Sequence, residues 1–229
     1  MSERCQKCLR PAEFCLCGLT KEIDPGMKFV FLMHPKEARR QRTGTGRIAR
    51  NSLKDAEIII GIDFTKSARL ERLLADPQLL PVLLYPKEPG ADIWTAEDPR
   101  LRAALGGRTL MPIIVDATWF CSRKIIERSP NLLELPRVSF AGSYRSIFTF
   151  KREPRPECVS TIETCYYLIK ELRAAGIARP DADPEPLMDV FKKLIQDQLR
   201  AENERIAGLR PNSHANDWKY TVPKEIPQF

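Results

Sequence analysis

Four cysteines near the amino terminus have the spacing of a metal site, C-x2-C-x6-C-x-C. They are Cys5, Cys8, Cys15 and Cys17. The chain opens without an apolar secretory segment, so disulfides are not expected and clustered thiols indicate a bound metal. Four thiolates suit tetrahedral Zn²⁺, and because sulfur fills every position the ion would be structural rather than catalytic. The alternative is a group of free thiols.

A second group of chemically versatile side chains stands at the end of an apolar run. The run "LMPIIV" begins at Leu110, and Asp116, Thr118 and Trp119 follow it. A carboxylate could act there as a general base, and an indole could stack on a nucleobase. Together they predict a site for a nucleoside-containing ligand. The structural alternatives are a turn or helix-cap role for Asp116 and a core position for Trp119.

Basic residues gather in two segments of a chain whose net charge is +7 and whose isoelectric point is about 9.1. Between positions 36 and 54 only Glu37 opposes the cations, which include Arg39, Arg40, Arg42, Arg47 and Arg50. The second segment contains Arg145, Lys151 and Arg152. Two basic segments in one small domain favour a nucleic-acid partner over two solvated surfaces.

Short apolar runs alternate with amphipathic segments along the chain, which predicts an α/β fold with a mostly parallel sheet and flanking helices. Strands are expected at residues 27–33, 57–62, 80–85, 111–116 and 137–141. Helices are expected at residues 48–54, 65–76, 120–129, 160–174 and about 185–207. The turn-rich stretch 86–100 is expected to be a surface loop, with a short helix after Pro99. Two parts are expected, a four-cysteine zinc knuckle at 1–24 and the α/β domain at 25–229.

The expected strand ends indicate where a ligand would bind, because parallel α/β sheets bind ligands beyond the carboxyl ends of their strands. His34 follows the first expected strand and Asp116 ends the fourth. Ser143, Tyr144 and Arg145 form a polar cluster after the fifth. Arg145 could bind a phosphate or carboxylate, or it could be an ordinary surface arginine.

The helix expected from residue 160 has a recognisable start. Ser160 or Thr161 can cap it, and Glu163 stands at the distance of a capping box. The amino end of that helix would also favour an anionic ligand, so the structural and functional interpretations are compatible.

Length and composition limit the class of protein. The chain has 229 residues, of which 43% are hydrophobic, enough for one domain with a full core. No stretch approaches the ~20 apolar residues that cross a bilayer, so no membrane partner is expected and the cytoplasm is the default location. A homodimer is possible, but nothing in the sequence marks an interface.

Three motifs in the order "MHPKE…RTGTG", "DATW" and "SYR…STIE" resemble those of the DTW-domain proteins. Together with the cysteine knuckle, the resemblance covers the chain from its first cysteines to about Lys170. It implies a SPOUT-like fold, a class of RNA-modifying enzymes in which the chain can be knotted. The sequence departs from the family pattern at Gly44, where "TGTG" stands in place of "TNTG", so any hydrogen bond from that asparagine is absent.

The resemblance implies a tRNA-uridine aminocarboxypropyltransferase. Such an enzyme moves the 3-amino-3-carboxypropyl group of S-adenosylmethionine to N3 of a tRNA uridine and releases methylthioadenosine. Catalytic roles would fall to Asp116, Thr118 and Trp119, with Asp116 as the base or as the partner of the donor's ammonium group. Donor contacts are expected from His34, Thr43, Thr45, Ser143, Tyr144, Arg145, Ser160, Thr161 and Glu163. Contacts to tRNA are expected from Arg39, Arg40, Arg42, Arg47, Arg50, Lys151 and Arg152.

Two other functions remain open on the sequence. One keeps the donor and changes the transferred group, which would make the protein an RNA methyltransferase. The other is a zinc-containing RNA-binding protein without catalytic activity, which would not bind S-adenosylmethionine.

Overall fold

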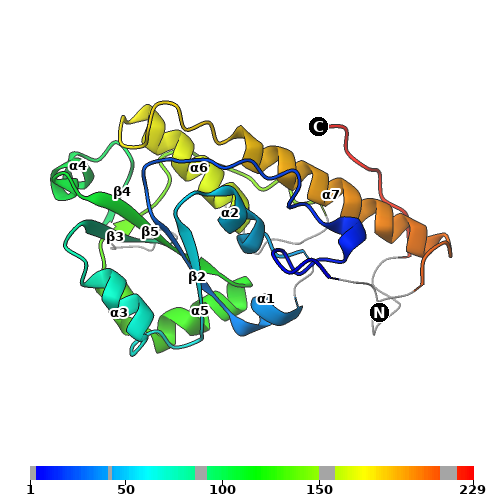
Figure 1. The fold of residues 1–229 in the computed structure, drawn as a ribbon, viewed down its shortest axis with the longest axis horizontal. Helices are drawn as coiled ribbons and strands as arrows, with labels where there is room; N and C mark the ends of the chain where they lie inside the picture. Colours follow the sequence, from blue (N-terminus) through cyan, green and yellow to red (C-terminus); the bar gives the residue numbers. More distant parts are fainter. Residues whose placement is uncertain (1–3, 41–42, 86–91, 150–157, 212–220) are drawn as a thin grey trace.

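The apolar runs of the sequence form the strands of a single six-stranded parallel sheet (Figure 1). The computed structural model describes residues 4–40, 43–85, 92–149, 158–211 and 221–229. The strands are β1 (Phe29–Met33), β2 (Ala56–Ile60), β3 (Leu79–Leu84), β4 (Ile93–Trp94), β5 (Thr109–Asp116) and β6 (Arg137–Val138). Their order across the sheet is β2-β1-β5-β3-β6-β4. The predicted α/β class and parallel sheet are therefore confirmed.

Seven α-helices connect and flank these strands in the described part of the chain. They are α1 (Pro35–Arg40), α2 (Gly46–Ser52), α3 (Ala68–Leu74), α4 (Pro99–Leu105), α5 (Trp119–Arg128), α6 (Thr161–Ala174) and α7 (Glu185–Ile206). Two short 3-10 helices cover Ala12–Phe14 and Pro130–Glu134. Among the described residues, no helix has both the length and the apolar character needed to cross a bilayer.

Two elements differ from the sequence-based prediction. The short helix α1 was not predicted. Pro35 occupies its first position, where a proline has no amide to lose and its fixed φ suits a helix. The strand β4 lies within the stretch expected to be a loop. It has two residues, and its pairing with β6 places Ile93 opposite Arg137 and Trp94 opposite Val138. Such a short strand depends on its partner and leaves no periodic pattern in the sequence.

Helices cover both faces of the sheet, with α2, α6 and α7 on one face and α3 and α5 on the other (Figure 1). Alternate residues of β1 contribute to the two layers. Phe29 and Phe31 belong to the cluster under α6 and α7, whereas Val30 and Leu32 belong to the cluster under α3 and α5. Because strand side chains alternate between faces, burial of both faces requires the unbroken apolar run that the sequence shows.

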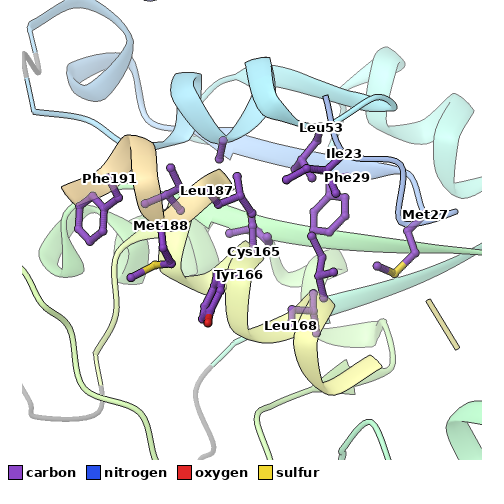
Figure 2. Close-up of a cluster of buried hydrophobic side chains, with 14 of the residues drawn as sticks. Ile23, Met27, Phe29, Leu53, Cys165, Tyr166, Leu168, Leu187, Met188 and Phe191 are labelled. Carbon is purple, nitrogen blue, oxygen red and sulfur yellow. The ribbon is translucent and has the colours of Figure 1, made fainter. Parts of the chain in front are cut away.

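The larger cluster joins segments that are far apart in the chain (Figure 2). The cluster includes Cys165 and Leu168 of α6, Leu187 and Phe191 of α7, and Phe29 of β1, all labelled in Figure 2. Leu16, within the cysteine-rich segment, is buried in this same cluster. The core of the α/β domain therefore anchors the cysteine-rich segment.

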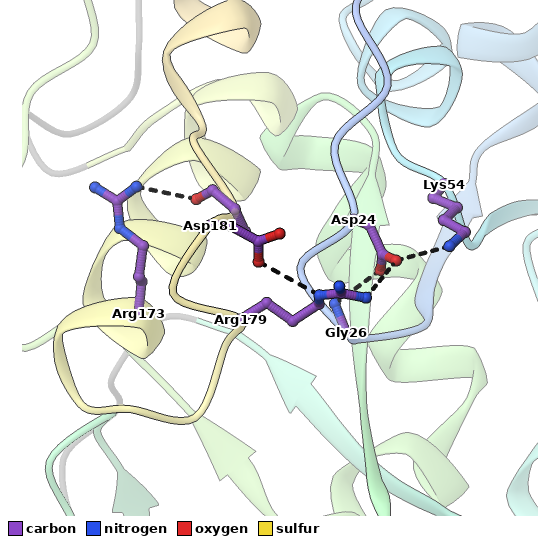
Figure 3. Close-up of polar contacts among 7 residues, drawn as sticks. Asp24, Gly26, Lys54, Arg173, Arg179 and Asp181 are labelled. Atoms are coloured by element: carbon purple, nitrogen blue, oxygen red, sulfur yellow. Dashed lines mark hydrogen bonds and ion pairs between the residues drawn. The ribbon is translucent and has the colours of Figure 1, made fainter.

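A polar network links the segment before β1 to two other parts of the chain (Figure 3). The Asp24 carboxylate accepts hydrogen bonds from Lys54 Nζ at 2.7 Å, Arg179 Nη1 at 2.9 Å and the Gly26 amide at 3.0 Å. These partly exposed ion pairs contribute little stability, but they fix the course of the segment leading into β1. This network lies at the amino end of β1, away from the strand end that Asp116 occupies.

The strand connections define a switch point between β1 and β5. These two strands are neighbours, yet β1 leads to β2 on one side and β5 leads to β6 on the other. In open α/β sheets the crevice beyond such a pair of carboxyl ends is where ligands bind. The last residues of the two strands, Met33 and Asp116, are paired in register.

Replacing Phe31 by alanine tests the core. This ring is fully buried in β1, so its removal should lower the free energy of unfolding by about 3–5 kcal/mol. Chemical denaturation measures the change. The matched control is Ile60→Ala at the end of β2, where the side chain is 53% exposed and the expected loss is below about 1 kcal/mol. Equal losses in both variants would contradict the described packing.

Candidate functional site

The four predicted metal ligands lie together in the structure. The sulfur atoms of Cys5, Cys8, Cys15 and Cys17 all lie within 4.8 Å of one another. The Sγ atoms of Cys5 and Cys17 are 3.8 Å apart, and those of Cys8 and Cys15 are 3.9 Å apart. Zinc–sulfur bonds of about 2.3 Å in a tetrahedron place sulfurs about 3.8 Å from one another. The cluster therefore has the dimensions of a zinc site with four cysteine ligands.

The charges around the cluster also fit a metal bound by thiolates. The backbone amides of Cys8 and Lys7 lower the pKa of the Cys5 thiol to about 6, whereas burial and the neighbouring thiols raise the pKa of Cys15 and Cys17. The Arg10 guanidinium is buried beside the cluster, and its Nη2 has no hydrogen-bond partner among the described residues. Burial lowers the pKa of Arg10, and the negative charges of Cys8 and Asp197 oppose that shift. A zinc tetrathiolate is a dianion, so a buried guanidinium beside it offsets part of its charge.

Asp116 lies at the centre of the predicted strand-end site. Its side chain is 5% exposed, and its Oδ1 accepts a hydrogen bond from Thr161 Oγ1 at 2.6 Å. Its Oδ2 lies directly against the backbone of Gly46, because a Cβ at that position would be only 2.2 Å away. The carboxylate thus joins the end of β5 to the first residues of α2 and α6. The amino end of α6 favours a negative charge at this place.

Two more predicted residues, Thr45 and His34, lie beside this site, because Thr45 precedes Gly46 and His34 pairs with the Asp116 backbone. Thr45 is buried, and its Oγ1 accepts a hydrogen bond from the Ile162 amide at 3.4 Å. The His34 amide donates to the Asp116 carbonyl at 3.0 Å, and His34 Nδ1 accepts from the Lys36 amide at 3.1 Å. Burial lowers the pKa of His34, and the nearby positive charges add to that shift. The imidazole is therefore neutral at neutral pH and carries its proton on Nε2.

A small, partly open cleft lies beside Asp116. Its walls come from six parts of the chain, namely the cysteine knuckle, the ends of β1 and β5, helix α1, the glycine-rich turn, and the start of α2. The lining residues are Arg4, Cys8, Leu9, Met33, Glu37, Ala38, Arg39, Gly44, Gly46, Arg47 and Asp116. The cleft lies at the β1–β5 switch point, where the sheet topology places a ligand.

The other two residues predicted from the "DATW" motif, Thr118 and Trp119, lie at the start of α5. Thr118 is exposed at the N-cap position, and its side chain makes no capping bond. Trp119 is half-buried and stacks on Tyr85, with ring centroids 6.3 Å apart and planes 10° apart. Phe120 was not singled out from the sequence. It is 59% exposed, and the ammonium of Lys124 lies 4.4 Å from its ring centroid. In the sequence, only its position directly after Trp119 could have drawn attention to Phe120.

The Ser160 and Glu163 side chains have structural partners at the start of α6. Glu163 is fully buried and accepts hydrogen bonds from the Ser160 amide at 2.8 Å, Ser146 Oγ at 2.7 Å and the Ile147 amide at 2.8 Å. The predicted capping box is therefore confirmed. Protein donors surround the Glu163 carboxylate, and the acidic residues that line the cleft are Glu37 and Asp116.

The predicted cluster of Ser143, Tyr144 and Arg145 lies along the side of α6. The Tyr144 hydroxyl donates to Glu171 Oε1 at 2.8 Å, and the Tyr144 ring stacks on Tyr167 with centroids 3.8 Å apart. Burial raises the pKa of Tyr144 to about 12. Glu171 follows Thr161 by ten residues in α6, which is about 15 Å along a helix. The structure therefore does not bring Tyr144 to Asp116.

The structure describes only some of the residues that were predicted to bind tRNA. Arg39 is exposed and lines the cleft. Arg47 is half-buried and also lines the cleft, and its Nη2 donates to the Ala38 carbonyl at 3.2 Å. Arg50 is exposed on α2, and Thr43 is half-buried in the turn before it. The Arg40 side chain, Arg42, Lys151 and Arg152 lie outside the described residues.

These observations define the class of protein, which is an α/β fold with a four-cysteine knuckle and a cleft at the switch point of its sheet. Residues 2–199 match the DTW domain, and the chain belongs to the DTW-domain family. It is 28% identical to tRNA-uridine aminocarboxypropyltransferase 2 of Drosophila melanogaster over 168 residues, which are 70% of this chain and 63% of that relative. The chain thus spans less than two thirds of that relative's length. No solved structure matches the chain.

Gly46→Ala tests the contact between the glycine-rich turn and Asp116. The added methyl would meet Oδ2 at 2.2 Å, so the variant should lose about 1–3 kcal/mol of unfolding free energy. The matched control is Gly18→Ala, where a Cβ would meet nothing within 4 Å and the change should stay within about 0.5 kcal/mol. Denaturation curves measure both. A Gly46→Ala variant as stable as the parent would place the carboxylate elsewhere.

Elemental analysis of purified protein tests the knuckle. The parent should contain equimolar zinc, and Cys8→Ser should lose it together with part of the thermal stability, because metal binding and local folding are coupled. Cys158→Ser is the control, since this cysteine lies outside the cluster. Stoichiometric zinc in the Cys8→Ser protein would contradict the assignment.

Proposed function

We propose that this protein transfers the 3-amino-3-carboxypropyl group of S-adenosylmethionine to N3 of a uridine in tRNA. Membership of the DTW-domain family and the likeness to a tRNA-uridine aminocarboxypropyltransferase support the reaction class. The observation that favours it in this chain is the cleft at the β1–β5 switch point, with a carboxylate on its floor and Arg39 and Arg47 on its wall. A cytoplasmic location suits a reaction on tRNA.

The reaction requires removal of one proton and displacement of one sulfur. Uracil N3 is a poor nucleophile while it carries its proton, so a carboxylate within hydrogen-bond reach would accept that proton. The N3 lone pair then forms a bond to the donor carbon Cγ, and the electrons of the Cγ–sulfur bond remain on sulfur. Methylthioadenosine leaves as a neutral thioether, so no acid is needed for the leaving group.

Asp116 is the candidate base because its carboxylate borders the cleft. The bond from Thr161 occupies one face of Oδ1 and fixes the orientation of the group. A base held in this way needs no rearrangement when the uridine arrives, which favours proton transfer in the correct geometry. Asp116 could instead bind the donor's ammonium group, and the same fixed orientation would serve that role.

Electrostatics favour an RNA acceptor beside this base. Arg39 and Arg47 line the cleft, and Arg50 is exposed on the adjacent helix α2. Guanidinium groups bind phosphate oxygens through paired hydrogen bonds. We expect tRNA binding to weaken with rising salt, as counterion release requires.

Nucleoside analysis separates the three candidate functions. Unmodified tRNA is incubated with the protein and S-adenosylmethionine, digested, and analysed by mass spectrometry. The proposed reaction adds the aminocarboxypropyl mass to uridine and forms methylthioadenosine. A methyltransferase would add only a methyl group and form S-adenosylhomocysteine. A non-catalytic RNA-binding protein would leave both tRNA and donor unchanged.

Asp116→Asn tests the proposed base. Asparagine keeps the size of the side chain and an acceptor for Thr161 but cannot take the N3 proton, so turnover should fall by roughly 10²–10⁴-fold. Affinity for tRNA, measured by filter binding, should stay within about twofold because the protein surface is unchanged. Asp55→Asn, at an exposed carboxylate before β2, is the control. If the Asp116→Asn variant turns over as fast as the parent, Asp116 is not the base.

A further inference from the structure

The cysteine knuckle contributes a wall of the cleft as well as a metal site. Arg4, Cys8 and Leu9 line the same cavity as Asp116 and Gly46. The knuckle is therefore close enough to the proposed reaction site to contact a substrate. Nothing in the spacing of its cysteines indicates this second role.

Leu9 has an unusual backbone conformation within this wall. Its φ is +59°, the only positive φ of a non-glycine residue in the described part of the chain. The turn around the thiols requires it, because the Leu9 amide donates to the Cys5 carbonyl at 2.8 Å. Glycine adopts this left-handed conformation without strain, whereas a residue with a Cβ does not.

Burial offsets the strain at Leu9 only in part. The side chain is 38% exposed and presents apolar surface to the cleft. Because part of the Leu9 side chain remains exposed, its burial offsets less of the strain than that of a fully buried side chain would. Strain of this kind is maintained at sites where the side chain has another use, such as contact with a ligand.

The charges around Leu9 indicate the type of ligand. Arg4, Arg39 and Arg47 line the cleft, against the two carboxylates of Glu37 and Asp116. The donor S-adenosylmethionine has a net positive charge in neutral solution, so this excess of arginine does not favour it. A nucleotide of RNA carries a phosphate that guanidinium groups bind well and a flat base that packs on an apolar side chain.

We propose that the knuckle wall receives the acceptor nucleotide, with the base packed on Leu9 and its phosphate near Arg4. This inference rests on the proposed function, because it takes the acceptor to be a tRNA uridine. In this position the base lies between Leu9 and the carboxylate of Asp116. The knuckle then serves as the acceptor side of the site, and its zinc holds that side in place.

Leu9→Gly separates contact with the ligand from support of the knuckle. Glycine relieves the positive φ, so zinc content and Tm should equal or exceed those of the parent. Affinity for unmodified tRNA should fall by on the order of tenfold, the loss expected when one base contact is removed. Affinity for S-adenosylmethionine, measured by isothermal titration, should not change. Leu9→Met, which retains an apolar chain, should bind tRNA as the parent does.

The matched control is Leu19→Gly, because Leu19 is 51% exposed near the knuckle but does not line the cleft. It should leave tRNA affinity unchanged. The inference is overturned if Leu9→Gly binds tRNA like the parent, loses zinc, or weakens donor binding instead. A parent protein that binds tRNA without modifying it would contradict the proposed reaction alone, since the tRNA affinities of the variants are measured without turnover.

Discussion

The site depends on the contacts that the buried carboxylate of Asp116 makes. It joins three segments, because β5 supplies it, Thr161 at the start of α6 donates to it, and the backbone of Gly46 at the start of α2 packs against it. A buried charge is unfavourable unless donors and local dipoles stabilise it, so these three segments must meet in one arrangement. The same arrangement leaves the carboxylate at the edge of the cleft, where it can take part in chemistry.

The cleft connects two parts of the sequence that look independent. The cysteine knuckle resembles a small accessory module, yet Leu16 is buried in the main core and Leu9 lines the cleft beside the sheet. A metal site whose ligands are all sulfur has no open position for a substrate. Its contribution to the proposed reaction is therefore geometric, since it holds a wall of the cleft in place.

Much of the fold could be predicted from the sequence, because each strand buried on both faces appears as an unbroken apolar run. The cluster of four cysteines was also predictable, since their spacing is local. The placement of Tyr144 was not, because it depends on a contact with Glu171 of α6, which is distant in sequence. The capping role of Glu163 was predictable, but its bonds to Ser146 and Ile147 are tertiary contacts. The close approach of Gly46 to Asp116 is likewise a tertiary contact, and neither residue marks it in the sequence.

A crystal structure of the protein with a donor analogue and a uridine-containing RNA would test the central claim most directly. The uracil N3 should lie about 3 Å from the Asp116 carboxylate, with the donor carbon approaching the same exocyclic side of N3, because the new N3–C bond takes the place of the N3–H bond. A uracil bound elsewhere, with the carboxylate still enclosed by Thr161 and Gly46, would show that Asp116 only holds the fold together.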